Sequence, residues 1–326
     1  MLYFIGYNNN EGSWTGNFNN ALRGEFTKRN IAYTELPPFD WDTQYSKLDY
    51  YTNIESSNDD IWFIGWAQSP VIELLQNKKG RKYGIVVGTV ANPFEPTVLW
   101  GGSENINERF RLGIYDKIFA VSDWCKELLT SAYPEIQYKV VSTGFPIDYQ
   151  IYDNYKYIGK QPKLIVFNQR FSVEKLNTLE VELSRRLISM GYVVKHFSGH
   201  PLESISLFNI NATALMDIMR NIGVEFVYNP TKEIYHQNLA KASFVVTTSI
   251  SDMLPNSMLE AIYMGAIPVA PRNLSFPEFI HPDNLYTPYD IQEMIDIIIK
   301  RPIREHGIMK YSKELIIERF LREMNV

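Results

Sequence analysis

The chain has 326 residues, of which 45% are apolar, 21% charged and 14% aromatic, with a formal charge of −5. This composition excludes general disorder, and the length suggests two domains of roughly 150 residues each. Residues 1–150 hold 13 basic against 18 acidic side chains, and the remainder holds 19 of each. The acidic first half argues against a broad surface for nucleic acid or anionic membrane.

The cysteine count and the lengths of the apolar segments indicate the cellular setting. Cys125 is the only cysteine, so no intramolecular disulfide and no cluster of thiolate zinc ligands are expected. The start MLYFIG has no basic lead and is too short for a signal peptide, and no window approaches the roughly 18 apolar residues of a membrane span. We expect a cytoplasmic protein without a transmembrane segment.

Short, nearly continuous apolar runs predict buried parallel strands. In chain order they are 2–5, 61–64, 83–87, 117–121, 163–167, 192–196, 224–228, 243–247 and 266–270. Amphipathic stretches at 18–29, 176–190, 285–300 and 308–326 predict helices. Alternating strands and helices imply parallel sheets with right-handed crossovers.

The strand–helix pattern runs twice, which predicts an α/β fold of two doubly wound, Rossmann-like domains. The first set ends near 140–141, a polar stretch rich in Tyr, Gly and Pro follows, and a fresh strand begins at Leu164. We therefore divide the chain into 1–150, 151–307 and a terminal helix over 308–326. Ligands of such sheets lie at the carboxyl ends of the strands, so the loops after strands are the candidate sites.

The loop after the first strand contains Gly12 and Gly16, and a helix is expected from about Asn17. A glycine-containing loop that leads into a helix amino terminus can bind an anion through backbone N–H groups. The alternative is a loop whose glycines only serve a positive φ.

Residues 249–271 predict a strand, a polar loop, a helix and another strand. Asn256 or Ser257 can cap the helix, so that its first-turn amides are open to a diphosphate. Glu260 has a purely structural alternative, because Ser257-x-x-Glu260 matches a capping box. Asp252, in the loop, is equally compatible with a solvated position.

The string DMLPNSMLEAIYMGAIPVAP resembles the signature of the group 1 glycosyltransferases (family 4), EGxPNxxLEAMAxGxPVV. Seven residues separate Asp252 from Glu260, as in the family. FNQRFSVEK at 167–175 is similar to the family's GRLxxEKG, which puts Arg170 and Lys175 on the pair that contacts donor phosphates. KIFAVSDWCKELL, VVSTGFPIDY and FPEFI resemble further family segments in the same order, so the resemblance covers 110–300 well and the first hundred residues weakly.

The resemblance implies a GT-B enzyme with two Rossmann-like domains facing across a cleft. Such an enzyme moves a hexosyl group from a nucleotide-sugar co-substrate, UDP-sugar first and GDP-sugar second, to an acceptor hydroxyl without a metal ion. The acceptor would be a glycan, a lipid-linked sugar, a protein or a small molecule. By the same resemblance, 1–150 is the acceptor side, 151–307 the donor side, and the terminal helix crosses back onto the first domain.

The resemblance also implies roles for single residues. Asp252 would contact hydroxyls of the donor sugar, with Arg170 and Lys175 also in the catalytic set, and Glu260 would hold the ribose. The remaining donor contacts would come from Gly16, the amides of Asn256, Ser257 and Met258, and a base-packing Tyr228.

Two departures from the family affect the reaction. Asp252 is one methylene shorter than the usual Glu, which leaves its reach to the sugar open. All five histidines follow residue 195, so the first domain lacks the commonest general base. This favours retention by a front-face route, with Glu11, Trp66, Thr89 and Asn92 as acceptor-side candidates. A solvated Glu11 and a core Trp66 are the structural alternatives.

Three other functions stay open at this point. The acceptor could be a modified base in DNA, as for phage transferases of this architecture, although the acidic first half weighs against it. The chain could be a catalytically idle nucleotide-sugar-binding protein, given Asp252 and the missing histidine. A phosphorylase or epimerase of the same architecture would turn over with inorganic phosphate or without acceptor.

Overall fold

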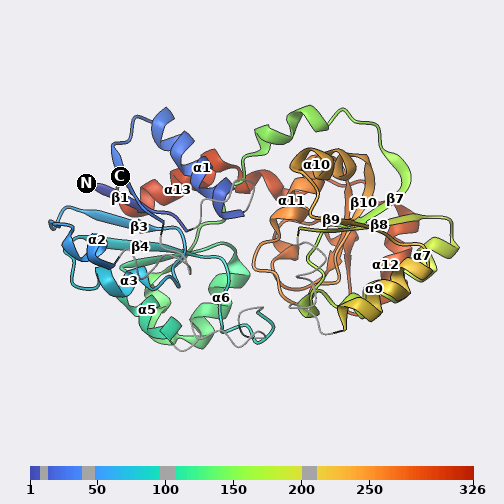
Figure 1. The fold of residues 1–326 in the computed structure, drawn as a ribbon, viewed down its shortest axis with the longest axis horizontal. Helices are drawn as coiled ribbons and strands as arrows, with labels where there is room; N and C mark the ends of the chain where they lie inside the picture. Colours follow the sequence, from blue (N-terminus) through green and yellow to red (C-terminus); the bar gives the residue numbers. More distant parts are fainter. Residues whose placement is uncertain (8–13, 39–47, 96–97, 99–106, 200–210) are drawn as a thin grey trace. The chain divides into compact units, whose positions relative to one another are not determined.

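The computed structural model describes residues 1–7, 14–38, 48–95, 98, 107–199 and 211–326. The chain divides into two compact units, one formed by Met1–Asp148 with Met309–Val326 and the other by Tyr149–Ile308. Each unit is built around a six-stranded parallel sheet flanked by helices (Figure 1). The predicted fold class, two doubly wound α/β domains, is confirmed.

The first unit has the strand order β2-β1-β3-β4-β5-β6. Its strands are β1 (Leu2–Ile5), β2 (Tyr33–Leu36), β3 (Ile61–Ile64), β4 (Arg81–Val86), β5 (Lys117–Ala120) and β6 (Val140–Ser142). Its helices are α1 (Trp14–Lys28), α2 (Leu48–Asn53), α3 (Val71–Leu75), α5 (Glu108–Ile114), α6 (Asp123–Ala132) and α13 (Lys313–Met324), with a 3₁₀ helix at Pro134–Lys139. Helices α1 and α13 lie on one side of the sheet, and α3 and α5 on the other (Figure 1).

The core of the first unit includes the C-terminal segment. The ring of Phe320 on α13 stacks on Phe119 of β5 with centroids 5.0 Å apart and lies 5.4 Å from Phe63 of β3. All three rings are fully buried. Lys313 pairs with Asp148 at 2.7 Å, so aromatic packing and an ion pair both hold the segment to this unit.

The second unit has the strand order β12-β11-β10-β7-β8-β9. Its strands are β7 (Gln161–Phe167), β8 (Val193–Ser198), β9 (Glu225–Tyr228), β10 (Ala242–Val246), β11 (Ile267–Pro271) and β12 (Leu285–Tyr286). Its helices are α7 (Asn177–Ser189), α9 (Ala212–Asn221), α10 (Lys232–Lys241), α11 (Asn256–Tyr263) and α12 (Ile291–Lys300). Short 3₁₀ helices occur at Tyr149–Tyr155, Val173–Lys175, Phe276–Glu278 and Pro282–Asn284, and another at Gly307–Tyr311 spans the boundary between the units.

The strand order of the second sheet reverses between β7 and β10. The chain leaves β7 toward β8 on one side and leaves β10 toward β11 on the other. Loops that diverge from neighbouring strands in this way open a space at the carboxyl edge of the sheet, where ligands of doubly wound folds bind. The switch point therefore fixes where this unit's ligand site is expected.

Three predicted helices have different bounds. The stretch 285–300 contains strand β12 and then a turn, and the helix begins only at Ile291, because Asp290 caps it by accepting from the N–H of Glu293 at 2.9 Å. The stretch 308–326 is a 3₁₀ turn followed by α13, not one helix. Helix α1 begins at Trp14, so Gly16 lies in its first turn and not in the preceding loop.

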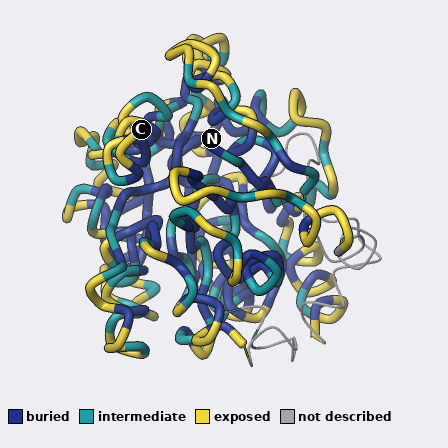
Figure 2. The backbone as a smooth tube through the Cα atoms, turned by 90° about the vertical axis from the view of Figure 1, so that its left-hand side faces the viewer, coloured by how far each residue is buried: buried dark blue, intermediate teal, exposed yellow. Residues whose placement is uncertain are grey.

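Burial follows the layers in both units. Strand β3 is buried at all four positions and β10 at all five, because helices cover both faces of each sheet. In Figure 2 the buried stretches of the chain lie mainly inside and the exposed stretches mainly at the periphery. Over the described residues, no helix combines the length and apolarity needed to cross a bilayer.

Candidate functional site

The residues of the sequence signature gather at the switch point of the second sheet. The loop 168–172 and the 3₁₀ turn Val173–Lys175 follow β7, and the loop 247–255 follows β10 and leads into α11. The N–H of Ile250 donates to the carbonyl of Glu174 at 2.9 Å, which ties the two loops together. Residues that are more than 70 positions apart in sequence thus form one edge.

Arg170 is held by a buried carboxylate. Its Nη2 and Nε donate to Oε1 of Glu174 at 2.8 and 3.2 Å, and the hydroxyl of Ser172 donates to the same oxygen. The side chain of Glu174 is 1% exposed, whereas that of Arg170 is 31% exposed. The arrangement presents an accessible cation in one orientation.

Lys175 and Asp252 are paired with each other. The ammonium Nζ lies 2.8 Å from each carboxylate oxygen of Asp252, and it also donates to Ser249 Oγ at 3.1 Å and to the carbonyl of Ser251 at 3.3 Å. Both side chains are largely buried, with 9% and 17% exposed. An anion that approaches the ammonium would compete with the carboxylate for it.

Helix α11 begins without a side-chain cap. Its N-cap is Pro255 in an extended conformation, so the predicted capping by Asn256 or Ser257 is wrong. The N–H of Met258 donates to the carbonyl of Pro255 at 3.0 Å and is already occupied. Within the described chain, the N–H groups of Asn256 and Ser257 have no acceptor, which leaves two first-turn amides, not three, for an anion.

Glu260 is not part of a capping box, because it lies in the middle of α11. It is 9% exposed, and its Oε2 accepts from the hydroxyl of Tyr235 at 3.4 Å. Burial raises the pKa of Glu260, and hydrogen bonds from Tyr152 and Tyr235 oppose that rise. The carboxyl group is therefore held inside the unit by two phenol hydroxyls.

Asn168, at the end of β7, connects this carboxylate to the start of α11. Its Nδ2 donates to the carbonyl of Ser257 at 2.7 Å and lies 3.5 Å from the hydroxyl oxygen of Tyr235. Because an amide NH₂ can only donate, the oxygen of Tyr235 accepts, and its proton is directed to Glu260. The chain Asn168–Tyr235–Glu260 links three elements.

A buried polar network beneath the loop after β7 was not predicted. His196 Nδ1 lies 2.6 Å from Oε1 of Glu180, and both side chains are fully buried. Oε2 of Glu180 accepts from Asn177 at 3.2 Å and from Gln169 at 3.4 Å, and Gln169 accepts from Thr247 at 2.8 Å. The network anchors the residue next to Arg170. Its sequence signal was an acid at position 180, beside the apolar positions 179, 183 and 187 of α7.

Tyr228 ends strand β9 at the edge of the sheet. Its hydroxyl accepts from Arg220 at 2.9 Å, and its ring is stacked with Phe226 at 5.7 Å between centroids. The guanidinium of Arg220 also lies over both rings. This aromatic–arginine stack rigidifies the strand end at which a base was predicted.

The candidate residues of the first unit lie in several places. Gly16 is buried in the first turn of α1, Trp66 is partly exposed after β3 and packs edge-on against Tyr7 at 4.5 Å, and Glu11 lies outside the described residues. Thr89 is 1% and Asn92 is 4% exposed. The Thr89 hydroxyl donates to the buried Glu108, and Asn92 accepts from the N–H of Phe94 at 3.1 Å.

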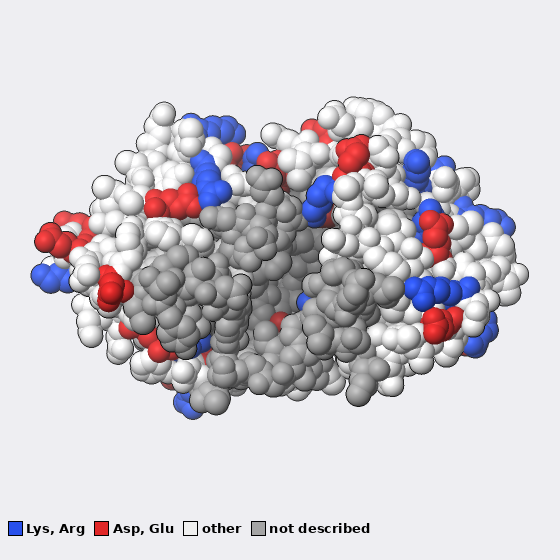
Figure 3. All heavy atoms as spheres, viewed as in Figure 1, with Lys and Arg blue, Asp and Glu red and all other residues white. Residues whose placement is uncertain are grey.

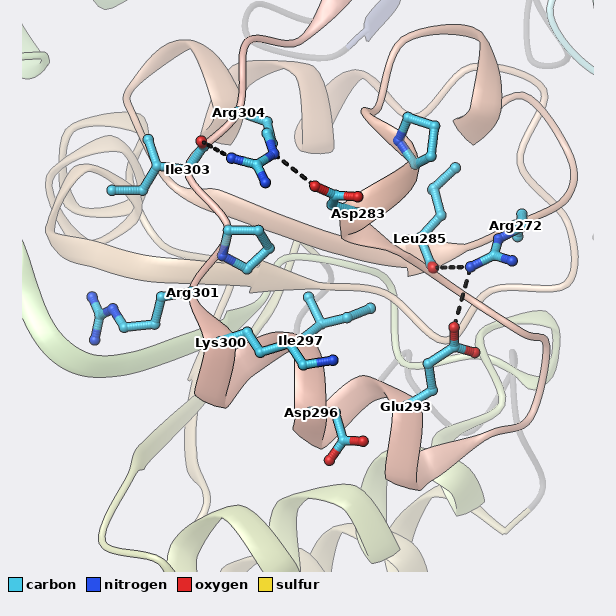
Figure 4. Close-up of a pocket in the computed structure, with 12 residues that line it drawn as sticks. Arg272, Asp283, Leu285, Glu293, Asp296, Ile297, Lys300, Arg301, Ile303 and Arg304 are labelled. Carbon is cyan, nitrogen blue, oxygen red and sulfur yellow. Dashed lines mark hydrogen bonds and ion pairs between the residues drawn. The ribbon is translucent and has the colours of Figure 1, made fainter.

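A separate hollow of about 640 Å³ lies along α12 and β12 (Figure 4). Arg272 bridges to Glu293 at 3.1 Å and Arg304 to Asp283 at 2.7 Å. None of the signature residues lines it. In the described part of the chain, no group of three or more His, Cys, Asp or Glu side chains could hold a metal ion.

No protein-family model matches the chain. Among solved structures it is similar to a TarM variant from S. aureus in complex with fondaparinux, alpha-GlcNAc-glycerol and UDP, with a TM-score of 0.66 and 17% identity over 86% of this chain. The chain spans 58% of the length of that protein.

Two further structures cover more of their own length. A glycosyltransferase from Rickettsia africae has a TM-score of 0.66 and 13% identity, over 99% of this chain and 97% of that one. A UDP-forming alpha,alpha-trehalose-phosphate synthase from Burkholderia xenovorans has a TM-score of 0.67 and 10% identity, over 83% and 75%. At these identities the similarity establishes the GT-B fold and nothing finer.

Proposed function

We propose that this GT-B chain is a glycosyltransferase that moves a hexosyl group from a nucleoside diphosphate sugar to an acceptor hydroxyl, with retention and without a metal ion. One observation carries the proposal: two cations, two helix amides and two carboxylates meet at the switch point of the second sheet. A UDP-sugar is the first candidate donor, because the similar TarM structure contains UDP, and a GDP-sugar is the second.

The cations and amides are suited to a leaving diphosphate. Negative charge grows on the phosphates as the glycosidic bond breaks, and preoriented charged donors stabilise it without reorganisation. Arg170 is accessible and oriented by Glu174. The N–H groups of Asn256 and Ser257 lie at the positive end of the α11 helix dipole, where they can donate to an anion. A phosphate oxygen that displaces Asp252 from Lys175 would free the Asp252 carboxylate to accept hydroxyls of the donor sugar.

We assign the remaining donor contacts by the family resemblance. Glu260 accepts the ribose hydroxyls, and the base lies near 227–231, beside Tyr228. The second unit is then the donor domain, 151–307, and 1–150 with 308–326 forms the acceptor side. Gly16 serves the phosphates through its backbone, whereas Thr89 and Asn92, whose side chains are buried, shape the loop that holds the acceptor.

Retention rests on the absence of histidine from residues 1–195. In a front-face reaction the acceptor oxygen attacks from the side of the leaving group, and a phosphate oxygen of that group takes the acceptor proton. No enzymatic base is then required on the acceptor side. On the face drawn in Figure 3, acidic and basic side chains of the described residues are scattered among uncharged ones, a pattern that does not favour a DNA duplex as the acceptor.

Donor hydrolysis by the purified protein tests the proposal. UDP-, GDP-, ADP- and dTDP-sugars are incubated with EDTA present, and released nucleoside diphosphate is measured. Release from one donor supports a metal-independent transferase and identifies the base. Thermal stabilisation by one nucleotide without release favours an idle binding protein or an enzyme that requires its acceptor. If no nucleoside diphosphate is released and no nucleotide stabilises the protein, the proposed donor site is contradicted.

Arg170→Ala tests the site itself. We expect donor binding to weaken at least about tenfold and turnover to fall by about 10²–10³, because a cation facing the leaving group is lost. The matched control is Arg186→Ala, which removes an Arg from a similar i,i+4 pair with Glu182 at 2.9 Å on the surface of α7. Equal donor affinity in the two variants would contradict the assignment.

A further inference from the structure

The carboxylate of Glu260 is held from inside the second unit. Tyr235 on α10 donates to Oε2 at 3.4 Å, and Tyr152 from the 3₁₀ helix Tyr149–Tyr155 donates to the same group. Neither tyrosine belongs to the signature string, and neither was a candidate from the sequence. Both hydroxyls use lone pairs of a carboxylate that has about four acceptor positions.

The direction of the Tyr235 hydrogen bond is fixed by Asn168. The amide Nδ2 of Asn168 donates to the carbonyl of Ser257 at 2.7 Å and lies 3.5 Å from the hydroxyl oxygen of Tyr235. The phenol oxygen therefore accepts from Asn168, and its proton has Glu260 as its partner. Loss of this hydroxyl would leave the carboxylate free to rotate without removing it.

The two tyrosine hydrogen bonds leave about two of the four acceptor positions of the carboxylate for further donors. A vicinal diol supplies two O–H donors with the spacing that one carboxylate accepts. A 2′-deoxyribose supplies only one. Discrimination between ribose and deoxyribose therefore depends on how well the carboxylate is aligned.

We propose that Tyr235 is a positioning residue that aligns Glu260 and thereby sets the preference for ribonucleotides over 2′-deoxyribonucleotides. This inference rests on the proposed function, in which Glu260 holds the ribose. Tyr152 donates to the same carboxylate, and its ring also packs edge-on against His236 at 5.1 Å. In this proposal Tyr235 and Tyr152 affect nucleotide binding only through Glu260.

The test is calorimetric titration of UDP and 2′-deoxy-UDP, and of GDP and 2′-deoxy-GDP, into the full chain. For the wild type we expect the ribonucleotide of the preferred base to bind about tenfold more tightly than its deoxy form, as loss of one charged hydrogen bond implies. Tyr235→Phe should reduce this ratio to about threefold or less and leave the affinity for the deoxy form unchanged. Glu260→Ala should bring the ratio to about one.

Tyr155→Phe is the matched control, because it removes another tyrosine–glutamate hydrogen bond, to Glu233 at 2.6 Å, on the exposed side of α10. It should keep the wild-type ratio. If Tyr235→Phe does not fold, Tyr152→Phe tests the same alignment through the second hydroxyl.

The outcomes separate two failures. An undiminished ratio in folded Tyr235→Phe, or an equal loss of affinity for both nucleotides, overturns the positioning role alone. A wild type that binds none of the four nucleotides overturns the proposed function and this inference with it. A reduced ratio with unchanged deoxynucleotide affinity supports both.

Discussion

Asp252 neutralises Lys175 in the free protein, since each of its carboxylate oxygens lies 2.8 Å from the ammonium. Both groups are mostly buried, so removal of one charge leaves the other poorly solvated. Breaking a fully buried pair costs about 3–5 kcal/mol, and we expect about 1–3 kcal/mol for this partly exposed one. In the proposed function, a donor phosphate that binds Lys175 would therefore change the stability of the second unit.

Asp252→Asn should lower the melting temperature and increase the stabilisation by UDP or GDP, whichever binds. The diphosphate becomes the principal counter-ion of Lys175, so it compensates a buried charge that is already compensated by Asp252 in the wild type. Thermal melts with and without nucleotide measure both effects. Glu182→Gln, which removes a surface carboxylate on α7 paired with Arg186 at 2.9 Å, is the control and should change neither. Equal nucleotide shifts in all three proteins would show that the diphosphate does not reach Lys175.

At the scale of elements, Gly144 follows strand β6 and packs closely against the C-terminal segment of the first unit. Its φ is +95°, and an added Cβ would lie 2.5 Å from Cδ1 of Ile316 and 3.0 Å from Cδ1 of Tyr311. Gly144→Ala should destabilise this unit by about 1–3 kcal/mol, through positive φ and overpacking against α13. Gly24→Ala, in the middle of α1 with open space around it, should instead stabilise by up to about 1 kcal/mol.

Urea unfolding followed by tryptophan fluorescence measures both glycine variants, because all six tryptophans belong to the first unit. A shift of the midpoint in opposite directions is expected. If Gly144→Ala leaves the midpoint unchanged, the side chain of Ile316 has moved aside and the positive φ carries little cost.

Elements with strong local patterns could be predicted from the sequence. Strands β1 and β3 have the predicted bounds, because a buried parallel strand needs a continuous apolar run and nothing else. Strand β12 has only two residues, too few to show a period, and it was absorbed into a predicted helix. Short elements are selected by pairing with a neighbour, here β11, and not by local preference.

The candidate site could also be predicted only in part from the sequence. The two family-like strings placed Asp252 and Glu260, from 252–271, and Arg170 and Lys175, from 167–175, in one region, since the strand–loop–helix pattern fixes which sheet edge each reaches. The ion pair between Lys175 and Asp252 spans 77 positions, and the Glu180–His196 contact is buried under the loop. Such contacts depend on three-dimensional packing, so no local pattern announces them. The capping-box alternative for Glu260 does not hold, because the N-cap is Pro255, two residues before Ser257.

For the whole molecule, acid affects the two units differently, because all five histidines lie in the second unit. Burial lowers the pKa of His236 and of His306 to about 4 each. The N–H of His281 also donates to Nδ1 of His306 at 3.2 Å, which requires that nitrogen to be unprotonated. Between pH 6.5 and 4 the unfolded chain therefore binds protons that the folded unit does not. The free energy of unfolding of the second unit consequently decreases as the pH is lowered.

Buried carboxyl groups have the opposite effect on how the free energy of unfolding depends on pH. Burial raises the pKa of Glu108 in the first unit, so this group favours the folded unit as the pH falls. Glu260 does the same in the second unit and offsets part of the effect of the two histidines. The net expectation is that acid weakens the second unit relative to the first.

Melting at two pH values measures this difference without dissecting the chain. Tryptophan fluorescence reports the first unit, while far-ultraviolet circular dichroism reports helices of both. At pH 4.5 the circular dichroism transition should begin at a lower temperature than the fluorescence transition, and the gap should be smaller at pH 7.5. His236→Phe keeps the aromatic contacts with Tyr152 and Tyr155 but cannot be protonated, so it should narrow the gap at pH 4.5. Coincident transitions at pH 4.5 would mean that the two units unfold as one cooperative body.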